Sequence, residues 1–282
     1  MTLTLPAPAK LNLFLHINGR RDDGYHQLQT VFALLDHGDT LAFSPADALS
    51  LQCHTENNQD ALPTDDSNLI LQAARALQAH TGSNKGAAIT LTKRLPLGGG
   101  VGGGSSDAAT ALLGLNRLWE LGLTLPELAH IGLALGADVP VFVRGRTAWA
   151  EGVGEIIRPI DTASRWYLIL RPDCEVSTAE IFSHEQLTRH DSPIKIAAFL
   201  EGATGNSCQK LVRTLYPEVD KALIWLDQFS PARLTGTGSC VFASFDSKSA
   251  AASVLEQCPT NMSGFIAKGV NHSPLHTTLA EA

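Results

Sequence analysis

Six glycines lie among the seven residues 98–104, and Ser105, Ser106 and Asp107 follow them directly. Residues without a β-carbon let the backbone turn tightly and approach a ligand closely. The next residues have the apolar spacing of a helix, so the loop brings free backbone N–H groups and the positive end of a helix to one point. That combination suits an anion. The segment therefore predicts a phosphate-binding site.

This glycine loop also has other interpretations. A segment rich in glycine and serine can be a flexible linker, but this one is short and lies between a strand-like run and a helix. The spacing Gly98-x-Gly100-x-x-Gly103 fits a dinucleotide fingerprint, which also needs an acidic residue at the end of a second strand about 20 residues further on. Residues 119–122 are instead typical of a helix end. Because no Gly-Lys-Ser/Thr follows the loop, the Walker A phosphate loop is excluded, and a phosphate loop of another lineage remains.

Two charged residues far apart in the chain could carry proton chemistry. Lys10 begins an alternating apolar segment, and Asp138 lies between the pairs 136–137 (Gly-Ala) and 139–140 (Val-Pro). Apolar surroundings raise the proton affinity of a carboxylate, and a nearby cation lowers it. The pair could therefore act as a base and its cationic neighbour. An isolated aspartate beside glycine and proline is usually a turn residue, and a lysine at a strand end is often solvated. The residue types alone leave both interpretations open.

Tyr25 and His26 follow the turn pair Asp23-Gly24. A tyrosine ring can stack on a pyrimidine, and a histidine can pair with the hydrogen-bonding edge of the base. An exposed aromatic pair at a turn therefore indicates a ligand. The alternative is a tyrosine packed under its own turn.

The elements that must position these residues follow from periodicity. Alternation predicts a half-buried strand at residues 10–17, with Asn12, Phe14 and His16 on its polar face. A helix capped by Ser67 is expected through about His80. Other expected strands are 29–35, 40–43 and 88–92, a second helix begins near Thr124, and extended structure is expected at 138–143 and 147–150. A new alternating block starts at residue 166, and a second glycine segment spans 234–245, so residues 158–165 mark a border between two α+β halves.

Composition restricts the class of protein. The chain has 282 residues, of which 44% are apolar and 17% charged, and its 21 basic and 28 acidic side chains give a net charge of −7. With no basic run, nucleic acid is not expected as a partner. The five cysteines are scattered without a CxxC pair, which favours reduced thiols. Neither a signal peptide nor a membrane span is evident, so a soluble, cytoplasmic protein is expected. Eight histidines without ligand spacing are expected at the surface or hydrogen-bonded (37, 54, 80, 130, 184, 190, 272 and 276).

Three segments together resemble one known family. In this order and at these spacings, residues 8–13, 96–107 and 234–240 are similar to motifs of the GHMP kinases, which phosphorylate small-molecule hydroxyl groups with ATP. The runs 19–26 and 136–142 look like the branch that phosphorylates the 2-hydroxyl of 4-CDP-2-C-methyl-D-erythritol in the non-mevalonate route to isoprenoid precursors. The likeness extends from residue 8 to about residue 245.

The resemblance implies a two-domain α+β fold. Residues 1–157 would form the N-terminal ATP-binding domain, with a left-handed βαβ-type core like that of ribosomal protein S5 domain 2. Residues 158–282 would form a ferredoxin-like C-terminal domain that completes the substrate site. The Gly236–Ser239 segment would close over the active site, although it could also be a plain hairpin turn. A monomer or weak homodimer is expected.

The resemblance also implies residue roles. Asp138 would take the proton from the 2-hydroxyl, with Lys10 beside it to orient it and neutralise charge. Mg²⁺ would be bound through the ATP phosphates with Ser106 and Asp107, which could alternatively only cap the helix. The residues expected to grip ATP are Pro96, Leu97, Gly98, Gly99, Gly100, Val101, Gly102, Gly103, Gly104, Ser105 and Ser106.

Six residues would bind the substrate: Asn12, Tyr25, His26, Phe32, Thr178 and Phe182. The last two lie in a segment that departs from the proline-containing sequence usual in the family. Other branches, such as homoserine or mevalonate kinases, remain alternatives, as does a nucleotide-binding module without catalytic activity.

Overall fold

A long antiparallel hairpin organises the molecule. The computed structural model describes residues 2–22, 24–56 and 62–282, so the Asp23 part of the turn pair lies outside the described residues. Strand β1 (Leu3–Arg20) pairs with β2 (His26–Ala46) over its whole length, and β5 (Ala148–Gly152), β10 (Met262–Val270) and β4 (Gly86–Lys93) share the other edge of β2 in turn. Strand β3 (Ser50–Thr55) runs parallel to β4. The two strands expected at 29–35 and 40–43 are thus one.

The prediction that residues 10–17 have an exposed polar face is wrong for two of its three residues. Asn12 and Phe14 are buried, like the leucines of the opposite face. The sheet is covered on both sides here. Phe14 packs in a cluster with Tyr167 and Phe242 of the C-terminal half, and helix α2 (Gly103–Leu118) packs against β1 from the N-terminal half.

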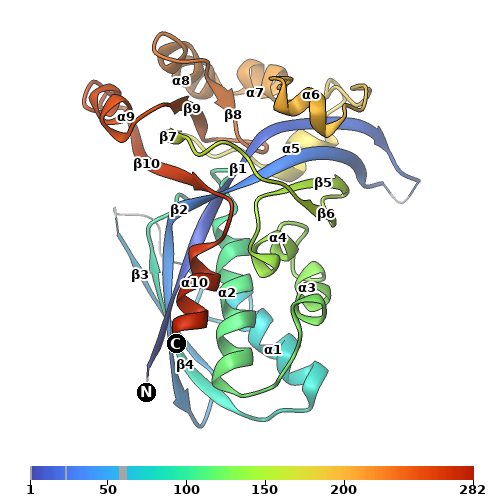
Figure 1. Cartoon of the computed structure of the whole chain (residues 1–282), viewed down its shortest axis with the longest axis vertical. Coiled ribbons are helices and arrows are strands. Elements are labelled where there is room, and N and C mark those ends of the chain that lie inside the picture. The colour runs from blue at the N-terminus through green and yellow to red at the C-terminus, as the bar shows by residue number, and fades with distance from the viewer. Residues whose placement is uncertain (1, 23, 57–61) are drawn as a thin grey trace.

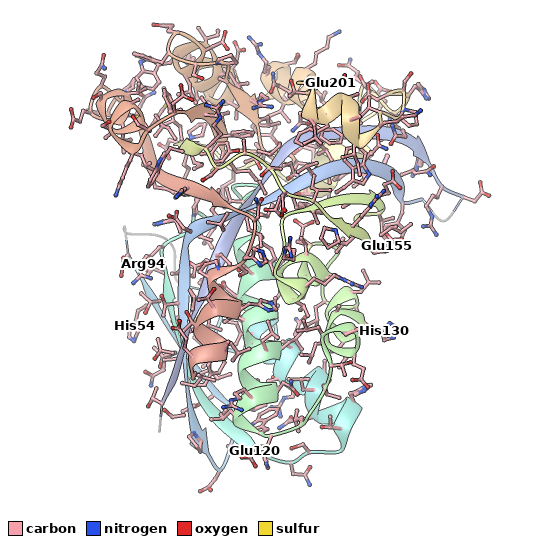
Figure 2. All side chains as sticks on the ribbon, viewed as in Figure 1. His54, Arg94, Glu120, His130, Glu155 and Glu201 are labelled. Carbon is pink, nitrogen blue, oxygen red and sulfur yellow. The ribbon has the colours of Figure 1, made fainter. Side chains whose placement is uncertain are left out.

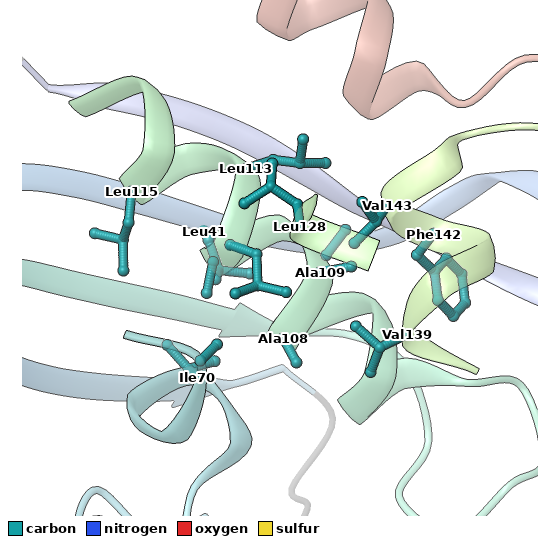
Figure 3. Close-up of a cluster of buried hydrophobic side chains, with 14 of the residues drawn as sticks. Leu41, Ile70, Ala108, Ala109, Leu113, Leu115, Leu128, Val139, Phe142 and Val143 are labelled. Atoms are coloured by element: carbon teal, nitrogen blue, oxygen red, sulfur yellow. The ribbon is translucent and has the colours of Figure 1, made fainter. Parts of the chain in front are cut away.

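Five helices contribute to the core of the N-terminal half. They are α1 (Leu69–Thr81), α2 (Gly103–Leu118), α3 (Leu125–Leu133), α4 (Val139–Arg144) and α10 (Pro274–Glu281). Figure 3 shows Leu41 of β2 among side chains from α1, α2, α3 and α4 in this core. Asn68, not Ser67, caps α1, because its side chain accepts from the Ile70 N–H. Thr124 caps α3 through a capping box with Glu127, as expected.

The extended structure expected at 138–143 is instead the short helix α4. Every residue of this helix except Arg144 is buried, so it lacks the apolar periodicity that separates a helix from a buried strand. Pro140 lies in its first turn, where a proline costs no hydrogen bond.

The C-terminal half has ferredoxin-like order. Strands β7 (Trp166–Pro172), β8 (Arg233–Leu234), β9 (Val241–Phe245) and β10 lie in the spatial order β10-β7-β9-β8, with antiparallel neighbours. Helices α5 (Thr178–Ser183), α6 (Ile196–Leu200), α7 (Gln209–Leu215) and α8 (Pro217–Asp227) follow β7, and α9 (Lys248–Leu255) follows β9. This is the β-α-β-β-α-β arrangement with additional helices. Strand β6 (Ile156–Pro159) pairs with β5.

Two crossings join the halves (Figure 1). Strand β10 pairs with both β7 and β2, and α10 then packs in the N-terminal core beyond the border expected at residues 157 and 158. In the other direction, the hairpin tip of β1 and β2 reaches the C-terminal half, where Leu15 and Ile17 pack in its core. We propose that the chain divides into two domains between residues 157 and 158, and that each domain contributes an element to the core of the other.

The cysteines and the periphery agree with the expectations. All five cysteines are free thiols. The labelled His54 and His130 are both exposed (Figure 2). In the described part of the chain, no helix is long and apolar enough to cross a membrane.

Candidate active site

One cavity of about 840 Å³ collects nearly all the predicted site residues. The glycine loop, β1, β2, the start of α4, α5 and the second glycine segment all contribute to its wall. The cavity brings together Lys10, Asn12, Tyr25, His26, Phe32, residues 96–105, Asp138, Thr178 and Phe182. Ser106 and Asp107 are not part of the lining. Residues as far apart in the sequence as Lys10 and Thr237 therefore meet at one site.

Backbone contacts hold the glycine loop between the two halves. The Lys10 N–H donates to the Val101 carbonyl at 2.9 Å, and the N–H groups of Ser239 and Cys240 each donate to a carbonyl of the loop at 3.2 Å. Gly100 has φ +70°, and a β-carbon there would lie 2.3 Å from the Thr235 carbonyl oxygen. The second glycine segment therefore packs directly on the first, and its Gly236 and Thr237 line the cavity.

The loop ends as the N-terminus of α2. Gly102, with φ +75°, is the N-cap residue, and no side chain caps the helix. The alternative that Ser106 and Asp107 only cap α2 is therefore wrong. Since Gly103, Gly104 and Ser105 line the cavity, the first helical N–H groups, which have no partner within the helix, lie at its wall. A phosphate at this position would meet both the N–H donors and the helix dipole.

Lys10 and Asp138 form an ion pair in the cavity. Lys10 Nζ lies 3.2 Å from Asp138 Oδ2 and donates to Asn12 Oδ1 at 2.6 Å. The lysine side chain is 4% exposed, whereas the aspartate is 31% exposed. The Asn12 amide in turn donates to Thr30 Oγ1 at 2.9 Å. The ammonium is thus buried and held by Asn12, while the carboxylate stays open to the cavity.

The other end of the cavity is aromatic. His26 and Phe182 lie with ring centroids 5.1 Å apart, and the Thr178 and Thr237 hydroxyls are 2.8 Å apart. Tyr25 is 65% exposed, so the alternative of a tyrosine packed under its own turn is wrong. Burial lowers the pKa of His26, and the neighbouring Arg189 and Arg20 cations lower it further.

A buried charge cluster, which no sequence pattern indicated, lies beneath the loop. Lys93 Nζ lies 2.6 Å from both Asp39 Oδ2 and Asp107 Oδ2, and Lys93 also lines the cavity. Asp39 Oδ1 accepts from the Arg94 and Leu95 N–H groups, just before the loop begins. The three charged residues come from separate segments, so no local pattern could reveal the cluster.

The cluster shifts the pKa values of Lys93 and Asp107. Burial lowers the pKa of Lys93, but Asp107 and Asp39 outweigh that effect and raise it overall. Burial raises the pKa of Asp107 to about 7, with Asp39 acting in the same direction against the attraction of Lys93. Two carboxylates share one ammonium here, so one of them holds its proton more tightly than in water.

Comparison with known proteins gives consistent matches. Residues 68–146 match the GHMP kinases N terminal domain, and residues 186–264 match the GHMP kinases C terminal domain. A protein of Alcanivorax borkumensis named 4-diphosphocytidyl-2-C-methyl-D-erythritol kinase is 66% identical, covering 100% of this chain and 95% of that protein. A Pseudomonas putida KT2440 protein of the same name is 57% identical over 98% of this chain and 96% of its own length.

Solved structures agree. The crystal structure of a 4-(cytidine 5'-diphospho)-2C-methyl-D-erythritol kinase superposes with a TM-score of 0.82 at 29% identity, covering 95% of this chain and 100% of that one. Methanococcus jannaschii mevalonate kinase superposes with a TM-score of 0.70 at 16% identity, which shows a shared fold alone; 96% of this chain and 98% of that one are covered. The two-domain α+β fold expected from the sequence is confirmed.

Proposed function

Because this chain belongs to the GHMP kinases, we propose that it uses ATP to phosphorylate the 2-hydroxyl of 4-CDP-2-C-methyl-D-erythritol. The products are the 2-phosphate of that substrate and ADP, within the methylerythritol phosphate route to isoprenoid precursors. One observation carries the proposal: a single cavity holds the glycine loop, the Lys10–Asp138 pair and an aromatic end suited to a pyrimidine.

The mechanism assigns the proton to Asp138. Phosphoryl transfer asks the protein mainly for positioning and charge stabilisation, with one group orienting the attacking hydroxyl. The exposed Asp138 carboxylate accepts the hydroxyl proton, and the buried Lys10 ammonium holds that carboxylate in place. Lys10 is itself fixed by Asn12, so the positive charge stays at the reacting centre while the phosphoryl group passes. The N–H groups of residues 103–105 hold the phosphates.

Mg²⁺ would neutralise the charge of the ATP phosphates. Among the described residues, no three His, Cys, Asp or Glu side chains could hold a metal together. Mg²⁺ commonly takes only one or two protein oxygens beside substrate phosphates. Ser106 Oγ and Asp107 Oδ1 are buried oxygens without a hydrogen-bond partner in the described structure, and their chemistry suits this ion. We propose these two oxygens for the ion; both lie in the first turns of α2, directly after the lining residues Gly103, Gly104 and Ser105.

The aromatic end of the cavity distinguishes the proposed activity from the activities of other branches of the family. Tyr25, Phe182 and the His26 edge suit a flat base with hydrogen-bonding groups. An assay of ADP release should show turnover with 4-CDP-2-C-methyl-D-erythritol and little with homoserine or mevalonate. A chain that prefers either of the small acids would be assigned to another branch.

Control variants sharpen that assay. Tyr25→Ala should raise the KM for the CDP-linked substrate more than the KM for ATP. An exposed control, Ile224→Ala on α8, is remote from the cavity lining and should change neither value. We also propose that it acts in the cytoplasm, as a monomer or weak homodimer.

A further inference from the structure

Arg189 lies just behind the aromatic end of the cavity, without lining it. Its guanidinium donates from Nε to His26 Nε2 at 3.0 Å, and from Nη2 to the carbonyls of Phe182 at 3.0 Å and His184 at 2.7 Å. A fourth bond runs from Nη1 to the Leu187 carbonyl at 3.2 Å. One side chain thus connects His26 and Phe182, whose rings lie in contact at the aromatic end of the cavity.

The bond to His26 fixes the proton of the imidazole. A neutral imidazole carries one N–H, and the nitrogen without it accepts hydrogen bonds. An arginine side chain stays protonated in proteins and can only donate. Nε2 of His26 must therefore be the acceptor, and the proton lies on Nδ1. The lowered pKa of His26, caused by burial, Arg189 and Arg20, keeps the ring neutral near pH 7.

We propose that Arg189 is a positioning residue that selects cytosine over uracil by holding His26 as the Nδ1–H tautomer. Cytosine presents an acceptor at N3, whereas uracil presents an N–H there. A fixed Nδ1–H donor can pair with the first and opposes the second. The hydrogen bond from Arg189 to the Phe182 carbonyl also holds the stacking ring at its place beside His26. The choice of base rests on the proposed function, whereas the tautomer does not.

The tautomer can be measured without any ligand. In ¹⁵N spectra of histidine side chains, assigned by comparison with His26→Gln, the wild-type His26 should show a protonated Nδ1. In Arg189→Met the same ring should shift toward the Nε2–H form. Arg213→Met is the matched control, because Arg213 pairs with Asp220 elsewhere in the C-terminal half. Amide spectra check that each variant is folded. A wild-type His26 protonated at Nε2 would overturn the inference.

Base selection can be measured by calorimetry with CDP and UDP, which requires no turnover. The wild type should bind CDP at least about ten-fold more tightly than UDP, since an opposed donor pair costs over 1 kcal/mol. Arg189→Met should reduce that ratio to about two-fold, and Arg213→Met should leave it unchanged. Equal binding of CDP and UDP by the wild type, or an unchanged ratio in Arg189→Met, would contradict the selecting role. A chain that discriminates these nucleotides but phosphorylates no substrate would refute only the proposed function.

Discussion

Replacing Gly100 by alanine should separate the two glycine segments. The residue has φ +70°, and an added β-carbon would lie 2.3 Å from the Thr235 carbonyl oxygen and 3.0 Å from that of Gly238. Both contacts are to backbone, so neither neighbour can rotate away as a side chain could. Gly98 is the matched control: its φ is +63°, but an added β-carbon there would have nothing within 4 Å.

The magnitude follows from these contacts. A left-handed conformation costs an alanine about 1 kcal/mol in either variant. In Gly100→Ala the segments must also move apart, which breaks hydrogen bonds from Thr235 Oγ1, Ser239 N and Cys240 N to the loop. At about 1 kcal/mol each, these losses bring the expected destabilisation of Gly100→Ala to about 4 kcal/mol, against about 1 kcal/mol for Gly98→Ala.

Urea unfolding followed by tryptophan fluorescence measures both free energies. The ATP KM should rise more in Gly100→Ala than in Gly98→Ala, because the first substitution displaces the loop and the second leaves its supports in place. Equal losses of stability in the two variants would refute the reasoning, since both carry the same backbone strain and only one meets the second segment.

Three further outcomes are expected. Asp138→Asn should lower kcat by about 10²-fold or more while the substrate KM stays within a few-fold; a near wild-type kcat would remove the base assignment. Burial and Asp39 raise the pKa of Asp107 in the folded protein to about 7, whereas an aspartate in the unfolded chain releases its proton near pH 4. The free energy of unfolding should therefore fall as pH rises between these values. Urea unfolding at pH 5 and pH 8 measures this: the stability of Asp107→Asn relative to the wild type should be greater at pH 8 than at pH 5. The same difference in unfolding free energy at both pH values would contradict this. Burial raises the pKa of Cys208 and Cys240 to about 12, so both thiols should resist a disulfide reagent at pH 8 until the protein unfolds; rapid labelling of the folded protein would count against this.

The sequence predicted the parts of the site that depend on local patterns. The glycine loop before an apolar helix indicates a phosphate site by itself, and the resemblance joined it correctly to Lys10 and Asp138 in one cavity. The short helix α4 was missed because all its residues except Arg144 are buried, so the helix has no distinguishing period.

Contacts between distant segments could not be predicted in this way. Lys93 looks like an ordinary strand-end lysine, and its two carboxylate partners are 54 and 14 residues away. Arg189 lies in an irregular segment without a motif, yet it bonds to His26 163 residues earlier in the chain. Such partners are chosen by the packing of the two halves, which a local pattern does not encode.

The most direct test of the central claim is phosphorus NMR of the reaction itself. Wild-type chain with Mg-ATP and 4-CDP-2-C-methyl-D-erythritol should produce one new phosphomonoester signal, coupled to the carbon skeleton at position 2, in step with ADP. Asp138→Asn should produce it at least about 10²-fold more slowly. A phosphate transferred to another hydroxyl, or ADP formed without the new signal, would contradict the account.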